Sequence, residues 1–388
     1  MAARVLSVFG TRPEVIKMAP VVRELQRRAG EFEPLVCVTG QHREMLDQIM
    51  KSFGLTADFD LNLMKPGQSP AAVASRVLRM LPPILRRVRP DLVLVQGDTT
   101  TTCSAAQAAF LERVPVGHVE AGLRTGDLDR PFPEEMNRRV TTVVSSLHFA
   151  PTSAARDALL REGVAPERVV LTGNTVIDAL LQSVRADYRF REPRLRALQR
   201  EECLILVTLH RRESIGTPMR QVCEAINQIA MRHPHAAIVI PVHRNPRVRE
   251  IVIRILAGRS NVHLLEPLAY LDFVNLMSRS RLILTDSGGV QEEAPSLKRP
   301  VLVLRDITER PEGVAAGAAK MVGTDPRRVV QAVDELLASE AAYQAMVTAS
   351  NPYGDGSAAR RIADAISSWY SDKQSLAGCQ RGAMAGAH

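Results

Sequence analysis

The most specific chemical pattern is a glycine-rich turn that follows an apolar run in the second half of the chain. The apolar run 282–285 leads directly into Asp286-Ser287-Gly288-Gly289. The start of a helix has free backbone N–H groups and a positive dipole end, which together bind phosphate. The two glycines allow close approach, and the carboxylate of Glu293 could accept hydrogen bonds from ribose hydroxyls. A purely structural turn would not need both glycines and the acid, so we predict a nucleotide diphosphate site.

Three acidic residues follow the ends of strand-like runs in the first half: Asp98, Glu120 and Glu134. In open α/β sheets, ligands bind beyond the carboxyl ends of the strands, so these side chains are candidates for a general acid or base. Each also has a structural interpretation. Asp98 could cap the next helix, and each of the three could be held in an ion pair with Arg124, Arg138 or Arg139.

Cationic residues occupy several other strand ends. Arg12 and Lys17 follow the first apolar run and could both meet a phosphate, or they could be solvated charges on a surface turn. His210 follows another run and is adjacent to Arg211, and Arg310 follows a later one. The positive electrostatic field of these side chains favours the binding of an anionic ligand.

The loops that usually bind dinucleotides or nucleoside triphosphates are absent from the sequence. No G-x-G-x-x-G follows a strand-like run, and no G-x-x-x-x-G-K-[ST] occurs. Hydride transfer by a bound dinucleotide is therefore disfavoured, and we expect no cofactor. The five cysteines have no metal-like spacing, so we expect no metal and mostly buried free thiols.

Short β-branched runs alternate with helical periodicity along the chain, which predicts an α/β protein with two Rossmann-like, doubly wound domains. Strands of the first series are predicted at 5–9, 34–39, 91–96, 114–119 and 147–150. Helices between them are predicted at 18–28, 43–53, 71–88 and 102–112. A second series of strands begins near 169–172 and resumes at 203–208, 237–241, 262–265, 282–285 and 300–304.

We place the domain boundary near Gly173. The prediction is an N-terminal domain over 1–173, a C-terminal nucleotide-binding domain over 174–356, a last helix over about 357–370 that packs back on the first domain, and a flexible tail over 371–388.

Composition excludes several classes of function. The chain has 388 residues and a formal net charge of +8, but only 4% aromatic residues, which argues against nucleic-acid binding. The N-terminal apolar run is too short for a signal peptide, and no run is long enough to span a membrane. We expect a cytoplasmic protein with no membrane or nucleic-acid partner.

Taken together and in order, these motifs resemble those of the non-hydrolysing UDP-N-acetylglucosamine 2-epimerases, which have the glycosyltransferase-B architecture. The resemblance covers about residues 4–370, and its motifs are GTRPEVIK (10–17), GDTTTT (97–102), GHVEAGLRT (117–125), PFPEE (131–135), LHRRES (209–214), DSGGVQEEAPS (286–296) and TERPEG (308–313).

The resemblance implies a site in the cleft between the domains and a role for each candidate. The catalytic group would be Asp98, Glu120, Glu134 and His210. The substrate would be bound by Arg12, Lys17, Ser287, Gly288, Gly289 and Arg310 at the phosphates, Glu293 at the ribose and Phe273 at the uracil. A regulatory second substrate molecule would meet Gln41, His42, Arg211 and His243.

The implied reaction is reversible inversion at C2 of UDP-N-acetylglucosamine, by loss of UDP to give 2-acetamidoglucal and its readdition. A homodimer is also implied. The alternatives are a UDP-sugar-dependent glycosyltransferase, a hydrolysing epimerase, an epimerase of a UDP-2,3-diacetamido sugar and a catalytically silent nucleotide-sugar sensor. Two departures bear on this: Gly67 stands where some relatives have an arginine of the regulatory site, and Ala269 and Asp272 could alter the uracil pocket.

Overall fold

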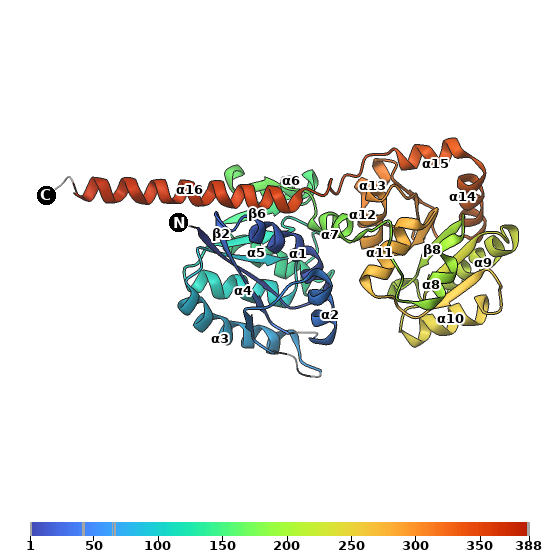
Figure 1. Cartoon of the computed structure of the whole chain (residues 1–388), viewed down its shortest axis with the longest axis horizontal. Coiled ribbons are helices and arrows are strands. Elements are labelled where there is room, and N and C mark those ends of the chain that lie inside the picture. Colours follow the sequence, from blue (N-terminus) through green and yellow to red (C-terminus); the bar gives the residue numbers. More distant parts are fainter. Residues whose placement is uncertain (1, 41–42, 64, 66, 386–388) are drawn as a thin grey trace. The chain divides into compact units, whose positions relative to one another are not determined.

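The computed structural model describes residues 2–40, 43–63, 65 and 67–385 (Figure 1). It divides into two compact units, residues 1–179 with 354–388 and residues 180–353. The first boundary lies a few residues beyond the predicted Gly173 because helix α7 (Thr175–Ser183) begins in the first unit. There the buried Asp178 accepts hydrogen bonds from the backbone N–H groups of Ala358 (3.1 Å) and Ala359 (2.9 Å).

The first unit is built on a parallel sheet. Its described residues form seven strands in the order β3-β2-β1-β4-β5-β6-β7. Their bounds are β1 Ala3–Phe9, β2 Phe32–Val38, β3 Phe59–Asp60, β4 Leu92–Gln96, β5 Val116–Val119, β6 Leu147–Ala150 and β7 Val169–Leu171. The doubly wound fold is confirmed, and the β-branched runs form its central strands because both faces are covered by helices.

Two strands of this sheet correct the sequence prediction. Val169–Leu171 was predicted to open the second series, but β7 pairs in register with β6, with His148 opposite Val169, and so closes the first sheet. The two-residue strand β3 was not predicted, since so short a run has no detectable periodicity.

Several helices of the first unit begin at a capping side chain. Their bounds are α1 Arg12–Arg27, α2 Arg43–Phe53, α3 Pro70–Val88, α4 Thr100–Leu111, α5 Glu134–Val144, α6 Ser153–Arg161, η1 Pro166–Arg168 and α16 Ala358–Ala385. The side chains of Ser69, Thr99 and Thr152 accept the backbone N–H groups that the first turns of α3, α4 and α6 leave free. Helix α1 begins at Arg12 rather than at the predicted residue 18, because Glu14 completes its first turn.

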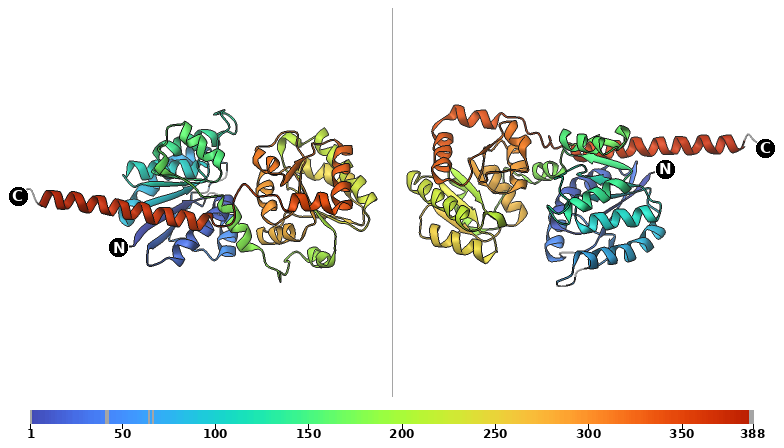
Figure 2. Two further views of the ribbon diagram at one scale, coloured as in Figure 1. Left: turned by 90° about the horizontal axis from the view of Figure 1, so that it is seen from above. Right: turned by 180° about the vertical axis from the view of Figure 1, so that it is seen from behind.

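Helix α16 lies along the first unit (Figures 1 and 2). Arg28 of the segment after α1 donates to Asp364 at 2.7 Å, and Ser367 donates to Glu31 at 2.9 Å. Helix α16 continues to Ala385, beyond the predicted helix end near residue 370, and the flexibility of the tail remains a prediction. The sequence from 371 to 385 contains no proline that would end a helix.

The second unit repeats the parallel α/β arrangement. Its described strands have the order β10-β9-β8-β11-β12-β13. Their bounds are β8 Leu204–Thr208, β9 Ala237–Pro241, β10 Val262–Leu265, β11 Leu282–Thr285, β12 Val301–Val303 and β13 Ala319–Met321. The helices are α8 Pro193–Ala197, η2 Leu198–Arg200, η3 Arg212–Ser214, α9 Thr217–Arg232, α10 Pro246–Leu256, α11 Tyr270–Arg279, α12 Gly288–Ser296, α13 Pro311–Ala315, α14 Pro326–Ala338 and α15 Glu340–Val347.

The charge-rich segment at the start of this unit is held in place by Asp272. This buried carboxylate accepts from the hydroxyl of Tyr188 at 2.8 Å and from the backbone N–H groups of Arg191 (3.0 Å) and Glu192 (3.1 Å). Asp272 therefore has a structural role in this unit. No helix among the described residues is long and apolar enough to cross a membrane.

Two fully buried histidines face each other on β5 and β6, where His118 is the register partner of His148. The ring Nε2 of His118 lies 2.8 Å from the carbonyl oxygen of Gly97. Desolvation is the main cause that lowers the pKa of His118 to about 4 and that of His148 to about 3. Both rings are therefore neutral at physiological pH.

These two pKa shifts predict that the protein loses stability in mild acid. Between the ordinary pKa of histidine and the lowered values, the unfolded chain binds protons that the folded chain does not, so stability falls as pH falls through this range. We expect a loss of about 1–2 kcal/mol per histidine near pH 5, measured by denaturant unfolding. His148→Phe should flatten this dependence, and an equally steep dependence in that variant would contradict the assignment.

Candidate active site

The carboxylate of Glu14 connects two loops at the carboxyl edge of the first sheet by hydrogen bonds. Its Oε2 accepts from the backbone N–H groups of Gly10 (3.0 Å) and Thr11 (2.6 Å). Its Oε1 accepts from the hydroxyls of Thr99 (2.7 Å) and Thr102 (2.9 Å). The loop before α1, the helix whose first residue is the exposed Arg12, is thereby fixed to the loop that carries Asp98.

Gly10 is required for this arrangement by close packing. A Cβ atom at this position would lie 2.0 Å from the hydroxyl oxygen of Thr39 and 2.9 Å from that of Thr101. Any side chain would push the first loop away from the end of β2 and from α4. Gly10 therefore sets the distance between the two loops that Glu14 connects.

Removing the Glu14 carboxylate should destabilise the protein. In Glu14→Ala two backbone N–H groups and two hydroxyls lose a buried acceptor, so we expect a loss of about 2–4 kcal/mol in the free energy of unfolding. Glu14→Gln keeps one oxygen for the backbone N–H groups, and the threonine hydroxyls can accept from its amide, so it should lose less than half as much. Denaturant unfolding of both variants measures this, and wild-type stability of Glu14→Ala would refute it.

Asp98 lies between β4 and α4 and is oriented by Arg138 of α5. The Nε and Nη2 atoms of Arg138 donate to Asp98 Oδ2 at 2.9 and 2.6 Å, while its Nη1 donates to Glu135 at 3.1 Å. Asn137 donates to the backbone carbonyl of Asp98 at 2.9 Å. Both of the hydrogen bonds that Arg138 donates to Asp98 go to the same carboxylate oxygen, Oδ2. Asp98 Oδ1 has no hydrogen bond to another described residue.

Glu120 lies at the end of β5 and is almost entirely buried, with 8% of its surface exposed. Its backbone φ of 64° is unusual for a residue with a side chain, and such conformations gather at functional sites. Lys17 contacts both carboxylate oxygens, at 2.5 and 2.7 Å. Gln96 also donates to this carboxylate, as does Asn174 at 3.1 Å. The structure thus brings two predicted site residues, Lys17 and Glu120, into one ion pair.

Glu134 is the first residue of α5, the helix that also carries Arg138. Its Oε2 is buried and has no hydrogen-bond partner among the described residues. A buried carboxylate oxygen without a donor is costly, so its retention is consistent with a role in proton transfer.

In the second unit, His210 follows β8 and is held by Asp286, which follows β11. The ring Nδ1 lies 2.9 Å from Asp286 Oδ1. Asp286 is fully buried and also accepts the backbone N–H groups of His210 (2.9 Å to Oδ2) and Arg211 (3.0 Å). The carboxylate keeps the ring proton on Nδ1, which leaves Nε2 of the neutral ring with its lone pair.

Helix α12 presents the predicted phosphate site. Its N-cap, Ser287, makes no capping hydrogen bond with its side chain, so the first N–H groups of the helix are left for a ligand. A Cβ atom at Gly288 would lie 3.4 Å from Nη2 of Arg211 and 3.8 Å from Cζ of Arg310. Two guanidiniums thus flank the glycine at which the helix begins, a suitable arrangement for a diphosphate.

Both arginines are anchored by acidic neighbours. Arg310 is paired with the buried Glu292 of α12, whose carbonyl oxygen accepts from Asn351 at 3.1 Å. Arg211 donates to Glu309 at 3.1 Å. Burial alone would raise the pKa of Glu309, but Arg211 and nearby Arg305 outweigh it and lower that pKa. The guanidiniums are therefore pre-oriented.

The remaining candidates for nucleotide and regulatory binding lie in the same unit or outside the described residues. Glu293 follows Glu292 in α12 and is half-buried, and Phe273 of α11 packs partly against the core. The ring of His243 lies 6.2 Å from that of His210. Gln41 and His42 lie outside the described residues.

The residues that position the candidate catalytic side chains were not predicted from the sequence. Glu14, Gln96 and Asp286 occur in the quoted motifs or beside them, but their types alone do not show which group they hold. Arg138 was considered only as an alternative partner that would remove an acid from catalysis. The structure shows it orienting Asp98 while leaving one carboxylate oxygen available. No group of three or more metal-ligating side chains occurs among the described residues.

These features define the class of protein as an α/β enzyme of two Rossmann-like units, with acids after strands of the first sheet and a glycine-started helix, flanked by two arginines, after β11 of the second sheet. The chain matches the family model for UDP-N-acetylglucosamine 2-epimerase over residues 23–367. It therefore belongs to the UDP-N-acetylglucosamine 2-epimerase family.

Individual relatives agree over nearly the whole chain. The UDP-N-acetylglucosamine 2-epimerase of Escherichia coli strain K12 is 54% identical over 376 residues, covering 94% of this chain and 98% of the relative. The Neisseria meningitidis enzyme, solved with UDP-GlcNAc bound, is 47% identical with a TM-score of 0.82, covering 94% and 99% of the two chains. A Listeria monocytogenes structure has a TM-score of 0.91 at 46% identity, covering 96% and 98%.

Proposed function

We propose that this protein interconverts UDP-N-acetylglucosamine and UDP-N-acetylmannosamine by inverting C2, as the names of its relatives indicate. The observation that carries the proposal is the set of acids at the carboxyl edge of the first sheet. Asp98 has an available oxygen, Glu120 is paired with Lys17, and Glu134 has an oxygen without a donor. These groups suit proton transfer at a carbon, which a sugar-transferring enzyme or a nucleotide sensor does not require.

The chemistry explains why a diphosphate site accompanies the acids. No carbonyl group lies beside C2 in the sugar ring, so direct removal of its proton faces a prohibitive barrier. When the C1–O bond to UDP breaks, positive charge develops at C1 and acidifies the C2 proton. A carboxylate takes that proton, and the electron pair of the C–H bond forms the C1–C2 double bond of 2-acetamidoglucal. Readdition of UDP at C1, with a proton delivered to the other face of C2, gives the epimer.

We propose that UDP stays bound through both steps by contacts at its phosphates, ribose and base. Ser287, Gly288, Gly289 and Arg310 are proposed at the diphosphate, with Arg12 and Lys17 as further phosphate ligands, Glu293 at the ribose and Phe273 at the uracil. Arg211 joins this set because it flanks Gly288 together with Arg310. This position supports a substrate-binding role for Arg211 besides the predicted regulatory one.

His210 is proposed to act at the leaving diphosphate rather than at C2. With Nδ1 held by Asp286, its Nε2 can carry a proton to a phosphate oxygen. A second UDP-N-acetylglucosamine bound near His243, Arg211, Gln41 and His42 remains a prediction, as does the binding of one substrate by residues of both units.

Product analysis tests the proposed activity. Phosphorus NMR of a reaction started with UDP-N-acetylglucosamine should show a second UDP-sugar accumulating to a constant ratio, with only traces of free UDP. Stoichiometric UDP with free N-acetylmannosamine would indicate a hydrolysing epimerase. UDP release only with an added acceptor would indicate a glycosyltransferase. A parallel assay with the UDP-2,3-diacetamido sugar separates the two epimerase substrates.

We also propose a cytoplasmic homodimer. Support comes from Phe110 and Leu111 at the end of α4, which are 57% and 72% exposed. Apolar side chains this exposed are frequent at subunit interfaces. Sedimentation velocity should give twice the chain mass for the wild type and one chain mass for the double variant Phe110→Ser, Leu111→Ser. A monomeric wild type would contradict the dimer, and a dimeric variant would contradict this interface.

A further inference from the structure

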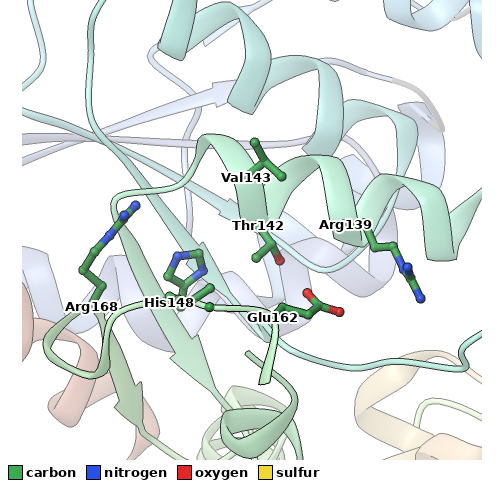
Figure 3. Close-up of a pocket in the computed structure, with 8 residues that line it drawn as sticks. Arg139, Thr142, Val143, His148, Glu162 and Arg168 are labelled. Atoms are coloured by element: carbon green, nitrogen blue, oxygen red, sulfur yellow. The ribbon is translucent and has the colours of Figure 1, made fainter. Parts of the chain in front are cut away.

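The first unit contains a cavity that the proposed reaction does not use. Its volume is about 420 Å³, and its wall includes Arg139 and Thr142 of α5, His148 of β6, Glu162 and Arg168 (Figure 3). This volume falls in the range of pockets that hold small metabolites.

The cavity lies at the amino ends of the strands, away from the candidate active site. His148 is the second residue of β6, and Arg168 immediately precedes β7. Asp98 and Glu120 instead follow the carboxyl ends of β4 and β5 in the same parallel sheet. The two sites are therefore on opposite edges of the sheet.

His148 is the first observation that points to a ligand. The side chain is fully buried and lines the cavity, and at least one of its two ring nitrogens has no hydrogen-bond partner among the described residues, the backbone of Ser145 being the group that interacts with the ring. Burial is the main cause that lowers the pKa of His148, with His118 and Arg168 acting in the same direction and the backbone of Ser145 in the other. A buried ring nitrogen without a partner destabilises the fold unless something in the cavity pairs with it.

The second observation is the charge of the wall. Glu162 is neutralised by Arg124, which donates to its two carboxylate oxygens at 2.8 Å each. Arg124 also donates to the hydroxyl oxygen of Thr142 at 2.9 Å, which leaves the hydroxyl proton of Thr142 for another acceptor. The acid in the wall therefore contributes little net charge to the cavity.

Two further guanidiniums keep donors available. Arg168 uses Nε and Nη2 on the carbonyl oxygens of Ser146 and Ser145, so its Nη1 has no partner among the described residues. Arg139 makes one 3.3 Å contact, from Nε to Glu135, and its terminal nitrogens are likewise without a described partner. Figure 3 shows these arginines on opposite sides of the cavity, with His148 between them.

We propose that this cavity is a second ligand site, for a small organic dianion whose oxygens meet Arg139 and Arg168 and whose middle contacts His148 and Thr142. Phosphorylated sugars and dicarboxylates share this chemistry. Guanidinium groups pair with either kind of oxyanion through two parallel hydrogen bonds. The site is independent of the proposed epimerase activity, because none of these residues belongs to the proposed catalytic group.

Titration calorimetry on the full-length protein tests the proposal, with glycerol 3-phosphate and succinate as separate probes. Saturating UDP is included so that the proposed diphosphate site is already occupied. We expect one saturable site per chain for at least one probe, and the probe that binds identifies the preferred oxyanion. Arg139→Gln and Arg168→Gln should each weaken binding at least about tenfold, because each removes a charge-assisted hydrogen bond.

Two further variants serve as controls for the binding measurement. Arg220→Gln removes the same charge from the exposed surface of α9 and should leave binding within about twofold. His148→Phe keeps an aromatic ring in the wall but removes both nitrogens, so it should fold and bind at least about tenfold more weakly. Absence of saturable binding with both probes, or equal affinity of wild type, Arg139→Gln and Arg168→Gln, would overturn the proposal. So would an equal loss in Arg220→Gln, since binding would then follow net charge alone.

Discussion

Asp98→Asn should reduce turnover of UDP-N-acetylglucosamine by about 10²–10⁴-fold, the usual contribution of a positioned general acid or base. The amide can place its oxygen where Oδ2 now accepts from Arg138 at 2.9 and 2.6 Å, so the loop should keep its geometry. Its nitrogen then replaces Oδ1, which is the oxygen left available to the substrate. An amide nitrogen cannot take a proton from C2 or return one.

The affinity for UDP separates this role from a structural one. If Asp98 acts on the sugar, the dissociation constant of UDP should stay within severalfold in Asp98→Asn, because the proposed phosphate ligands are unchanged. Asp127→Asn is the matched control: Asp127 is exposed and 3.9 Å from Arg130, and its loss should leave turnover within about twofold. Wild-type turnover of Asp98→Asn would remove Asp98 from the mechanism.

Asp286→Asn should lower turnover by about 10²–10³-fold by changing the ring proton of His210. The amide oxygen can keep the two backbone N–H groups that now donate to Oδ2 at 2.9 and 3.0 Å. The amide nitrogen then faces Nδ1 and donates to it, which moves the ring proton to Nε2. The ring is no longer oriented to take up a proton at Nε2 and deliver it to the diphosphate.

A second aspartate–histidine pair in the same unit provides the control. Asp334 accepts from His233 at 2.7 Å between α9 and α14, outside the candidate site. Asp334→Asn should leave turnover unchanged. Nitrogen-15 NMR of the His210 ring reports the tautomer directly. An Asp286→Asn protein that retains the Nδ1–H tautomer, or full turnover, would contradict this role for Asp286.

The sequence predicted the parts of the fold that have strong periodicity. The strands 147–150, 237–241, 262–265 and 282–285 occur at the predicted residues, because buried parallel strands are continuous apolar runs bounded by turns. The short strand β3 and the assignment of β7 to the first sheet could not be predicted from apolar runs. Their place depends on pairing with β2 and β6, which is not encoded in the local pattern.

In the candidate site, too, some features could be predicted from the sequence and others could not. Strand ends and glycines indicated where ligands bind, and the structure brings Lys17 to Glu120 and places Arg211 and Arg310 beside Gly288. The groups that orient the catalytic candidates could not be predicted, because Asp286 lies far from His210 in the sequence. Their contact exists only because β8 and β11 are neighbours in the sheet.

The central claim is proton exchange at C2 with UDP bound throughout, and incubation in deuterium oxide tests it most directly. With the wild-type protein, UDP-N-acetylglucosamine recovered at equilibrium should carry solvent-derived deuterium at C2 and at no other carbon, as should the epimeric product. Mass spectrometry and proton NMR measure this. Epimerisation with the C2 hydrogen fully retained, or active protein that incorporates no deuterium, would contradict the elimination and readdition proposed here.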